Sequence, residues 1–135
     1  MANEHVQVFM EGAHGNHIIP YQVSGSTTAV EKGALLGLFV DRTVSGSSTV
    51  GEACAGIAAR EVIASDGRDQ VGVHKKGYFR GAISGSVAIG APLMSAGHEN
   101  YLKGANTVVS GSQIIGYAEQ TAAATSTSFL WRLDL

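Results

Sequence analysis

The chain has 135 residues, of which 44% are hydrophobic and 15% are charged, with 18 glycines and two prolines. This composition is too apolar for a disordered tail and too poor in proline for a low-complexity linker, and the length suits a single domain with its own core. Nine Lys and Arg against eleven Asp and Glu give a formal net charge of −2, which excludes the basic footprint of a nucleic-acid-binding protein.

The cellular compartment is indicated by the cysteine count and the N-terminus. Cys54 is the only cysteine, so the chain cannot form an intrachain disulfide, and its small-residue surroundings "GEACAGIAA" predict a buried, unreactive thiol. The N-terminus lacks the basic and apolar regions of a signal peptide, and no apolar run approaches the ~20 residues that cross a bilayer. We expect a protein of a reducing cytosol, with neither membrane nor nucleic acid as a partner.

Residues 1–22 form an N-terminal segment without a counterpart elsewhere in the chain. Alternating apolar residues in "HVQVFM" predict a strand. Two interpretations stay open: an edge strand of the domain, or an arm that pairs with a strand edge of another chain. The candidate contacts with a capsid or a second subunit are the apolar and histidine residues of this segment: Val6, Val8, Phe9, Met10, His14, His17, Ile18, Ile19 and Tyr21.

Period-two patterning continues through the remaining chain and shows no helical stripe of useful length. Strands are expected within residues 35–41, 56–64, 70–75, 77–83 and 114–120. Asp66 and Gly67, between two of these strands, predict a hairpin turn. In the last strand, "SFLWRLDL", the side chains of Phe129, Trp131 and Leu133 share one face with the terminal Leu135. The sequence therefore predicts an all-β fold.

One four-letter turn recurs along the chain. "VSGS" stands at residues 23–26, 44–47 and 109–112, and "ISGS" stands at 83–86. Each copy pairs a β-branched residue with a Ser-Gly bend. Because the sequences that follow these turns recur in the same order, residues 23–58 and 83–120 are predicted to be two copies of one β-unit. We expect residues 23–135 to form a single, pseudo-duplicated small β-barrel or β-sandwich of short strands.

A catalytic signature is missing from the sequence. The Ser-Gly-Ser words lack the spacing of a nucleophile elbow, and no Walker loop is present. His14 and His17 form an H-x-x-H pair without a third ligand at a recognised spacing, so they are weak metal candidates only. His74, followed by two lysines, is interpreted as a solvated basic cluster, and His5 and His98 show no companions. The chain is predicted to be no enzyme and to need no metal or cofactor.

The order of motifs along residues 23–135 resembles one family. The motifs are "VEKGALLGLFVD", "VGEACAGIAAREV", "VGVHKKGYFRGAI", "IGAPLM", "IIGYAEQTA" and "SFLWRLDL". In this order they resemble the small bacteriophage head decoration, or cement, proteins, of the glycine- and alanine-rich type encoded near the major capsid protein. The resemblance implies a small β-barrel or β-sandwich, commonly a homotrimer, that is made in the host bacterial cytoplasm. It also implies binding to the major capsid protein on the outer surface of the expanded capsid, and a place in the virion.

A second class of function uses the same turns and strands. A phage tail or spike module, or a carbohydrate-binding domain, would also be a small all-β protein. An exposed cluster of Tyr78, Phe79 and Tyr101 on one face would favour sugar binding.

Overall fold

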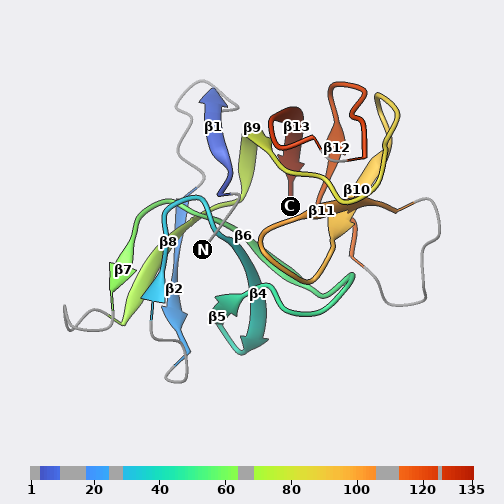
Figure 1. Ribbon diagram of the computed structural model, residues 1–135. Coiled ribbons are helices and arrows are strands. Elements are labelled where there is room, and N and C mark those ends of the chain that lie inside the picture. The colour runs from blue at the N-terminus through green and yellow to red at the C-terminus, as the bar shows by residue number, and fades with distance from the viewer. Residues whose placement is uncertain (1–3, 10–17, 25–28, 64–68, 106–112, 125) are drawn as a thin grey trace.

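The computed structural model describes residues 4–9, 18–24, 29–63, 69–105, 113–124 and 126–135 (Figure 1). Throughout these ranges the regular structure is β, in thirteen short strands, which confirms the predicted all-β fold. The strands that the sequence predicts around residues 6–9, 35–40, 70–74, 76–81 and 129–134 are all present. The hairpin predicted at Asp66 and Gly67 lies outside the described residues.

The first half of the chain closes into a barrel. Its strands are β2 (Ile18–Val23), β4 (Leu35–Val40), β5 (Thr43–Gly46), β6 (Cys54–Ala58) and β8 (Gln70–His74), in the order β2-β5-β4-β6-β8. Two further strands, β3 (Ala29–Val30) and β7 (Val62–Ile63), pair antiparallel as a separate ribbon. Closure leaves no free strand edge in the barrel, which removes a common route to aggregation.

The second half forms a six-stranded sheet in the order β1-β9-β13-β12-β10-β11. Its strands are β1 (Val6–Phe9), β9 (Lys76–Gly81), β10 (Pro92–Ser95), β11 (Leu102–Gly104), β12 (Gly116–Ala118) and β13 (Phe129–Asp134). A parallel bridge between Ile83 and Leu102 brings β11 back to the chain just beyond β9. The N-terminal β1 lies at the outer edge of this sheet, antiparallel to β9.

The two halves repeat one pattern of strand pairing. In the first half β2 pairs with β8, β4 with β5 and with β6, and β6 with β8. The second half repeats these antiparallel pairs as β9 with β13, β10 with β11 and with β12, and β12 with β13. The parallel β2–β5 contact corresponds to the Ile83–Leu102 bridge, and the β3–β7 ribbon corresponds to an antiparallel bridge between Val87 and Ala122. This repeated pairing extends over residues 18–74 and 76–134, further than the ranges compared in the sequence.

Equivalent glycines mark the same position in both halves. Gly56 in β6 lies opposite Leu36 in β4, and Gly116 in β12 lies opposite Leu93 in β10. A Cβ on Gly56 would collide with the carbonyl oxygen of His74, and a Cβ on Gly116 with that of Arg132. Glycine is therefore required at both places, because the neighbouring strand backbone approaches too closely for any side chain.

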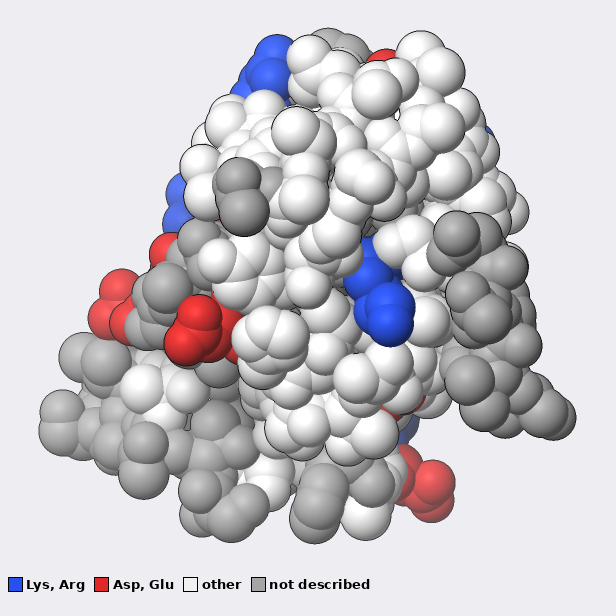
Figure 2. Space-filling model, turned by 45° about the vertical axis from the view of Figure 1, so that its right-hand side comes forward, with Lys and Arg blue, Asp and Glu red and all other residues white. Residues whose placement is uncertain are grey.

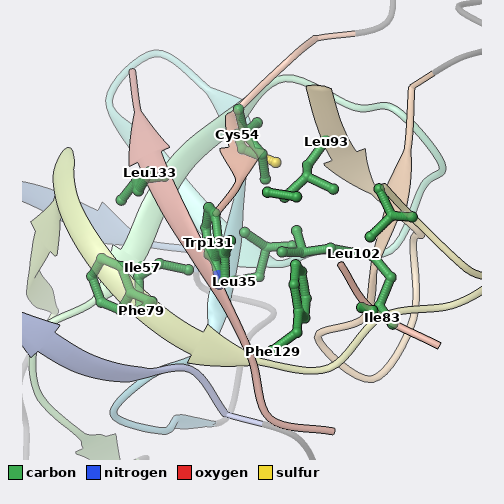
Figure 3. Close-up of a cluster of buried hydrophobic side chains, with 14 residues drawn as sticks. Leu35, Cys54, Ile57, Phe79, Ile83, Leu93, Leu102, Phe129, Trp131 and Leu133 are labelled. Atoms are coloured by element: carbon green, nitrogen blue, oxygen red, sulfur yellow. The ribbon is translucent and has the colours of Figure 1, made fainter. Parts of the chain in front are cut away.

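The fold has two hydrophobic cores, and strands that lie between the cores contribute side chains to both. The first fills the barrel, and the second fills the space beneath β9, β10, β12 and β13. Strand β6 is buried along its whole length: Ala55 and Ala58 belong to the first core, while Cys54 and Ile57 belong to the second. Figure 3 shows Leu35, Cys54 and Ile57 among the side chains of the second half. The small residues of "GEACAGIAA" are explained by this position, because only small side chains fit on a strand covered on both faces.

The C-terminal strand supplies the largest side chains of the second core. Phe129, Trp131 and Leu133 are buried and alternate with half-buried residues, as the sequence predicts, and Leu135 is partly buried against the same cluster. Cys54 is also buried as predicted. Burial, and then the nearby charge of Glu52, raise the pKa of its thiol to about 12, so the thiolate that reacts with oxidants and alkylating agents is suppressed.

Candidate interaction surfaces

A buried polar cluster fixes the N-terminal segment to both halves of the fold. The ring of His5, just before β1, is only 4% exposed. Its Nδ1 accepts a hydrogen bond from the indole Nε1 of Trp131 at 3.1 Å. Its Nε2 therefore carries the proton and donates to the carbonyl oxygen of Asn100 at 2.9 Å. Burial lowers the pKa of His5 to about 4, so the ring is neutral at pH 7.

We call this arrangement the His5 cluster. Its members are His5, Gly81, Asn100 and Trp131. The side-chain oxygen of Asn100 accepts a hydrogen bond from the backbone N–H of Leu35 at 2.9 Å. The backbone N–H of His5 donates to the carbonyl oxygen of Gly33 at 2.8 Å. Any side chain at Gly81 would collide with the imidazole. The expectation that His5 has no companions is wrong, because its partners lie about a hundred residues away and only the tertiary fold reveals them.

A cleft of about 400 Å³ adjoins the His5 cluster between β1 and the barrel. Its lining includes Lys32, Ile57, Phe79 and His74. His74 is 7% exposed and packs edge-on against Phe79, and its Nδ1 has no hydrogen-bond partner among the described residues. Burial, and then the charge of Lys32, lower the pKa of His74. The predicted solvated basic cluster is therefore wrong for His74, whose ring belongs to the interior.

The predicted contact residues of the N-terminal segment are divided between two sheets. Val6, on the outer strand β1, is 64% exposed. Ile18 and Ile19, in β2, are each nearly 40% exposed and pair with β8, whereas the pairing of β2 with β5 is confined to Gln22 and Val23. Tyr21 is half-buried against the barrel core, with the ammonium of Lys75 4.6 Å from its ring centroid. Met10, His14 and His17, and the side chains of Val8 and Phe9, lie outside the description.

The aromatic residues considered for sugar binding do not make an exposed platform. Phe79 is 1% exposed and belongs to the second core. Tyr101 is half-buried beside His98, with ring centroids 5.3 Å apart, so His98 also has a companion that the sequence did not reveal. Within the described residues, no group of three His, Cys, Asp or Glu side chains could hold a metal ion. In the same part of the chain, no helix is long and apolar enough to span a membrane.

Charged residues are unevenly distributed between the halves. Of the nine Lys and Arg and eleven Asp and Glu in the chain, only Glu99, Lys103 and Glu119 lie within residues 82–131. Figure 2 shows one face of the molecule with a broad area of uncharged residues in its upper part, while acidic and basic side chains gather along the left side of the view. Residues 82–131 therefore contribute few charges, whereas the ends of the second half hold Lys76, Arg80, Arg132 and Asp134.

Comparison with known proteins finds a likeness at the level of the fold. Neither a family model nor a curated protein sequence matches the chain. Among solved structures, the chain is similar to the N base of head fiber gp8.5 from bacteriophage phi29, with a TM-score of 0.55 and 15% sequence identity. The likeness covers 87% of this chain and 92% of that one. The two chains thus share a fold over nearly their whole length.

Proposed function

We propose that the chain is a structural protein of a bacteriophage virion, a decoration protein that binds the outer surface of the expanded capsid and stabilises it. Its partner would be the major capsid protein, and it would act as a homotrimer, without catalysis, metal, cofactor, nucleic acid or membrane. The single observation that carries the proposal is the fold shared with the base of a phage head fiber. The order of sequence motifs, which resembles that of capsid decoration proteins, is a second reason for the proposal.

The physical character of the molecule suits this role. Two rigid β-units joined by a common core make a stiff module, and its polar groups are used for internal contacts such as the His5 cluster. A decoration protein needs no deep ligand site, because many weak contacts repeated by the symmetry of a shell act together through avidity. A surface with few charges also permits close packing against another protein without desolvating ions.

The alternative is a fiber, tail or spike module of the phage particle. The likeness to a head fiber base favours it, because that chain is named as part of a fiber. The two functions differ in their distribution on the particle: a decoration protein covers the capsid surface at symmetry-related positions, whereas a fiber base occupies attachment points of fibers.

Binding to capsids tests the proposal. Purified protein is mixed with expanded and with unexpanded capsids of the phage that encodes it, and the capsids are sedimented. We expect the protein to pellet with expanded capsids in a saturable amount and to stay in the supernatant with unexpanded ones. If the protein does not pellet with expanded capsids even when it is present in large excess over the capsid protein, the proposal is contradicted.

A further inference from the structure

The duplicated fold offers an internal comparison between two equivalent surfaces. In the first half, the ribbon of residues 29–32 and 60–63 is built on the pairing of Val30 with Val62. In the second half, the ribbon of residues 84–90 and 121–124 is built on the pairing of Val87 with Ala122. We call the first the charged ribbon and the second the uncharged ribbon. In each ribbon a glycine with positive φ stands three residues after the paired valine, Gly33 after Val30 and Gly90 after Val87, which places their residues in register.

The two ribbons differ in charge at equivalent positions. After its paired valine, the charged ribbon continues with Glu31 and Lys32, whereas the uncharged ribbon continues with Ala88 and Ile89. The opposite strand of the charged ribbon also holds Arg60 and Glu61. Lys32 and Ile89 are both exposed, and Ile89 is 67% exposed. The first ribbon has the composition of a solvated surface, and the second has the depletion of charge that marks the centre of a protein interface.

Hydrogen bonds hold the uncharged ribbon in one conformation. The backbones of Val87 and Ala122 exchange hydrogen bonds of 2.9 and 3.0 Å in both directions. Gly85 N–H donates to the carbonyl oxygen of Ala124 at 3.2 Å, and Ile89 N–H donates to the hydroxyl oxygen of Thr121 at the same distance. A surface fixed in this way loses little conformational entropy when a partner docks.

From these observations we infer that the uncharged ribbon is the surface that contacts the protein shell of the capsid. The contact is with an uncharged patch of capsid-protein surface, into which Ile89 projects its side chain. This inference rests on the proposed function and assigns a part of the molecule to it.

The size of the ribbon decides between the shell and a second copy of the chain. Nine of its residues are exposed: Ser84, Gly85, Ser86, Ala88, Ile89, Gly90, Thr121, Ala123 and Ala124. A stable interface between two free proteins uses roughly 20–30 residues on each side. The ribbon is too small to hold two free copies together, but in the proposed homotrimer three linked ribbons bind the shell at once, so that three small contacts act together.

An exchange of residues between the ribbons tests the inference. The double variant Ala88→Glu/Ile89→Lys gives the uncharged ribbon the residues of the charged one, and the matched control Glu31→Ala/Lys32→Ile does the reverse. Neither changes the formal net charge, so long-range electrostatics are the same in all three proteins. Sedimentation with expanded capsids measures binding, thermal unfolding measures folding, and light scattering of the free protein measures self-association.

The expected result is that Ala88→Glu/Ile89→Lys binds expanded capsids at least tenfold more weakly than the parent, while the control binds no more weakly than the parent. Equal binding of parent and variant would overturn the inference and leave the proposed function standing. A change in self-association without a change in capsid binding would overturn it in favour of a contact between copies. A parent that does not bind would instead refute the proposed function itself. If the double variant fails to fold, Ala123→Glu on the opposite strand of the ribbon provides the same test.

Discussion

Acidification of the His5 cluster is expected to destabilise the fold by an amount that follows from its geometry. Protonation would place an N–H on Nδ1, facing the indole N–H of Trp131, where no acceptor exists. The pKa of His5 is lowered from 6.5 to about 4 in the folded chain. The unfolded chain therefore binds more protons than the folded chain between these values, and stability falls as the pH is lowered through this window.

The magnitude follows from the size of the shift. A difference of one pKa unit corresponds to 1.36 kcal/mol, so the loss between pH 7 and pH 4 approaches about 3 kcal/mol, of which about 2 kcal/mol is lost by pH 5. That amount is a large share of the stability of a small domain. The carboxyl of Asp134, whose pKa is lowered by its ion pair with Lys76, loses its contribution only at lower pH.

The assay is urea unfolding at pH 7, 6 and 5, carried out on the parent and on His5→Gln. Glutamine keeps a donor and an acceptor at the position of the imidazole but does not titrate. We expect the free energy of unfolding of the parent to fall by about 2 kcal/mol more than that of His5→Gln between pH 7 and pH 5. His74 titrates in both proteins, so its effect cancels in the comparison. Parallel pH dependences would refute the assigned role of His5.

Three further predictions concern other parts of the fold. Gly116→Ala should lower the melting temperature by about 5 °C or more, because its Cβ meets the carbonyl oxygen of Arg132, and an unchanged melting curve would contradict the close strand approach. Cys54 should not react with a thiol reagent at pH 8 until denaturant is added, since the pKa of its thiol is raised to about 12, and rapid labelling of the native protein would disagree with its burial. Deletion of residues 2–9 should strongly destabilise the fold, because it removes β1 and leaves the indole N–H of Trp131 without its acceptor. A near-native thermal transition of the deletion variant would instead indicate that this segment is a dispensable arm.

The strands were predictable from the sequence because period-two alternation is a local signal. The alternation of Phe129, Trp131 and Leu133 already indicates which face of the last strand is buried. The four-letter turn words were a weaker guide: Gly85 in "ISGS" has the positive φ of a bend, whereas Val44, Ser45 and Gly46 of the second "VSGS" lie within strand β5 and pair with β4.

Long-range contacts could not be predicted in the same way. His5 has no neighbours of interest within its own segment, and its partners come from a loop and a strand in the second half. His74 stands beside two lysines in the sequence, yet the fold turns its ring toward Phe79. The sequence already aligns Glu31 with Ala88 through the repeated Gly-Ala-x-Leu motif, but that these residues lie on equivalent paired ribbons, with Lys32 and Ile89 exposed, required the structure.

Cryo-electron microscopy of expanded capsids incubated with the protein tests the central proposal most directly. The proposed function predicts added density on the outer capsid surface at symmetry-related positions, in threefold clusters into which the fold of one barrel and one six-stranded sheet can be placed. It also predicts that the ribbon of residues 84–90 and 121–124 faces the shell. Capsids without added density, or density confined to attachment points of fibers, would contradict the assignment of this protein as a capsid decoration protein.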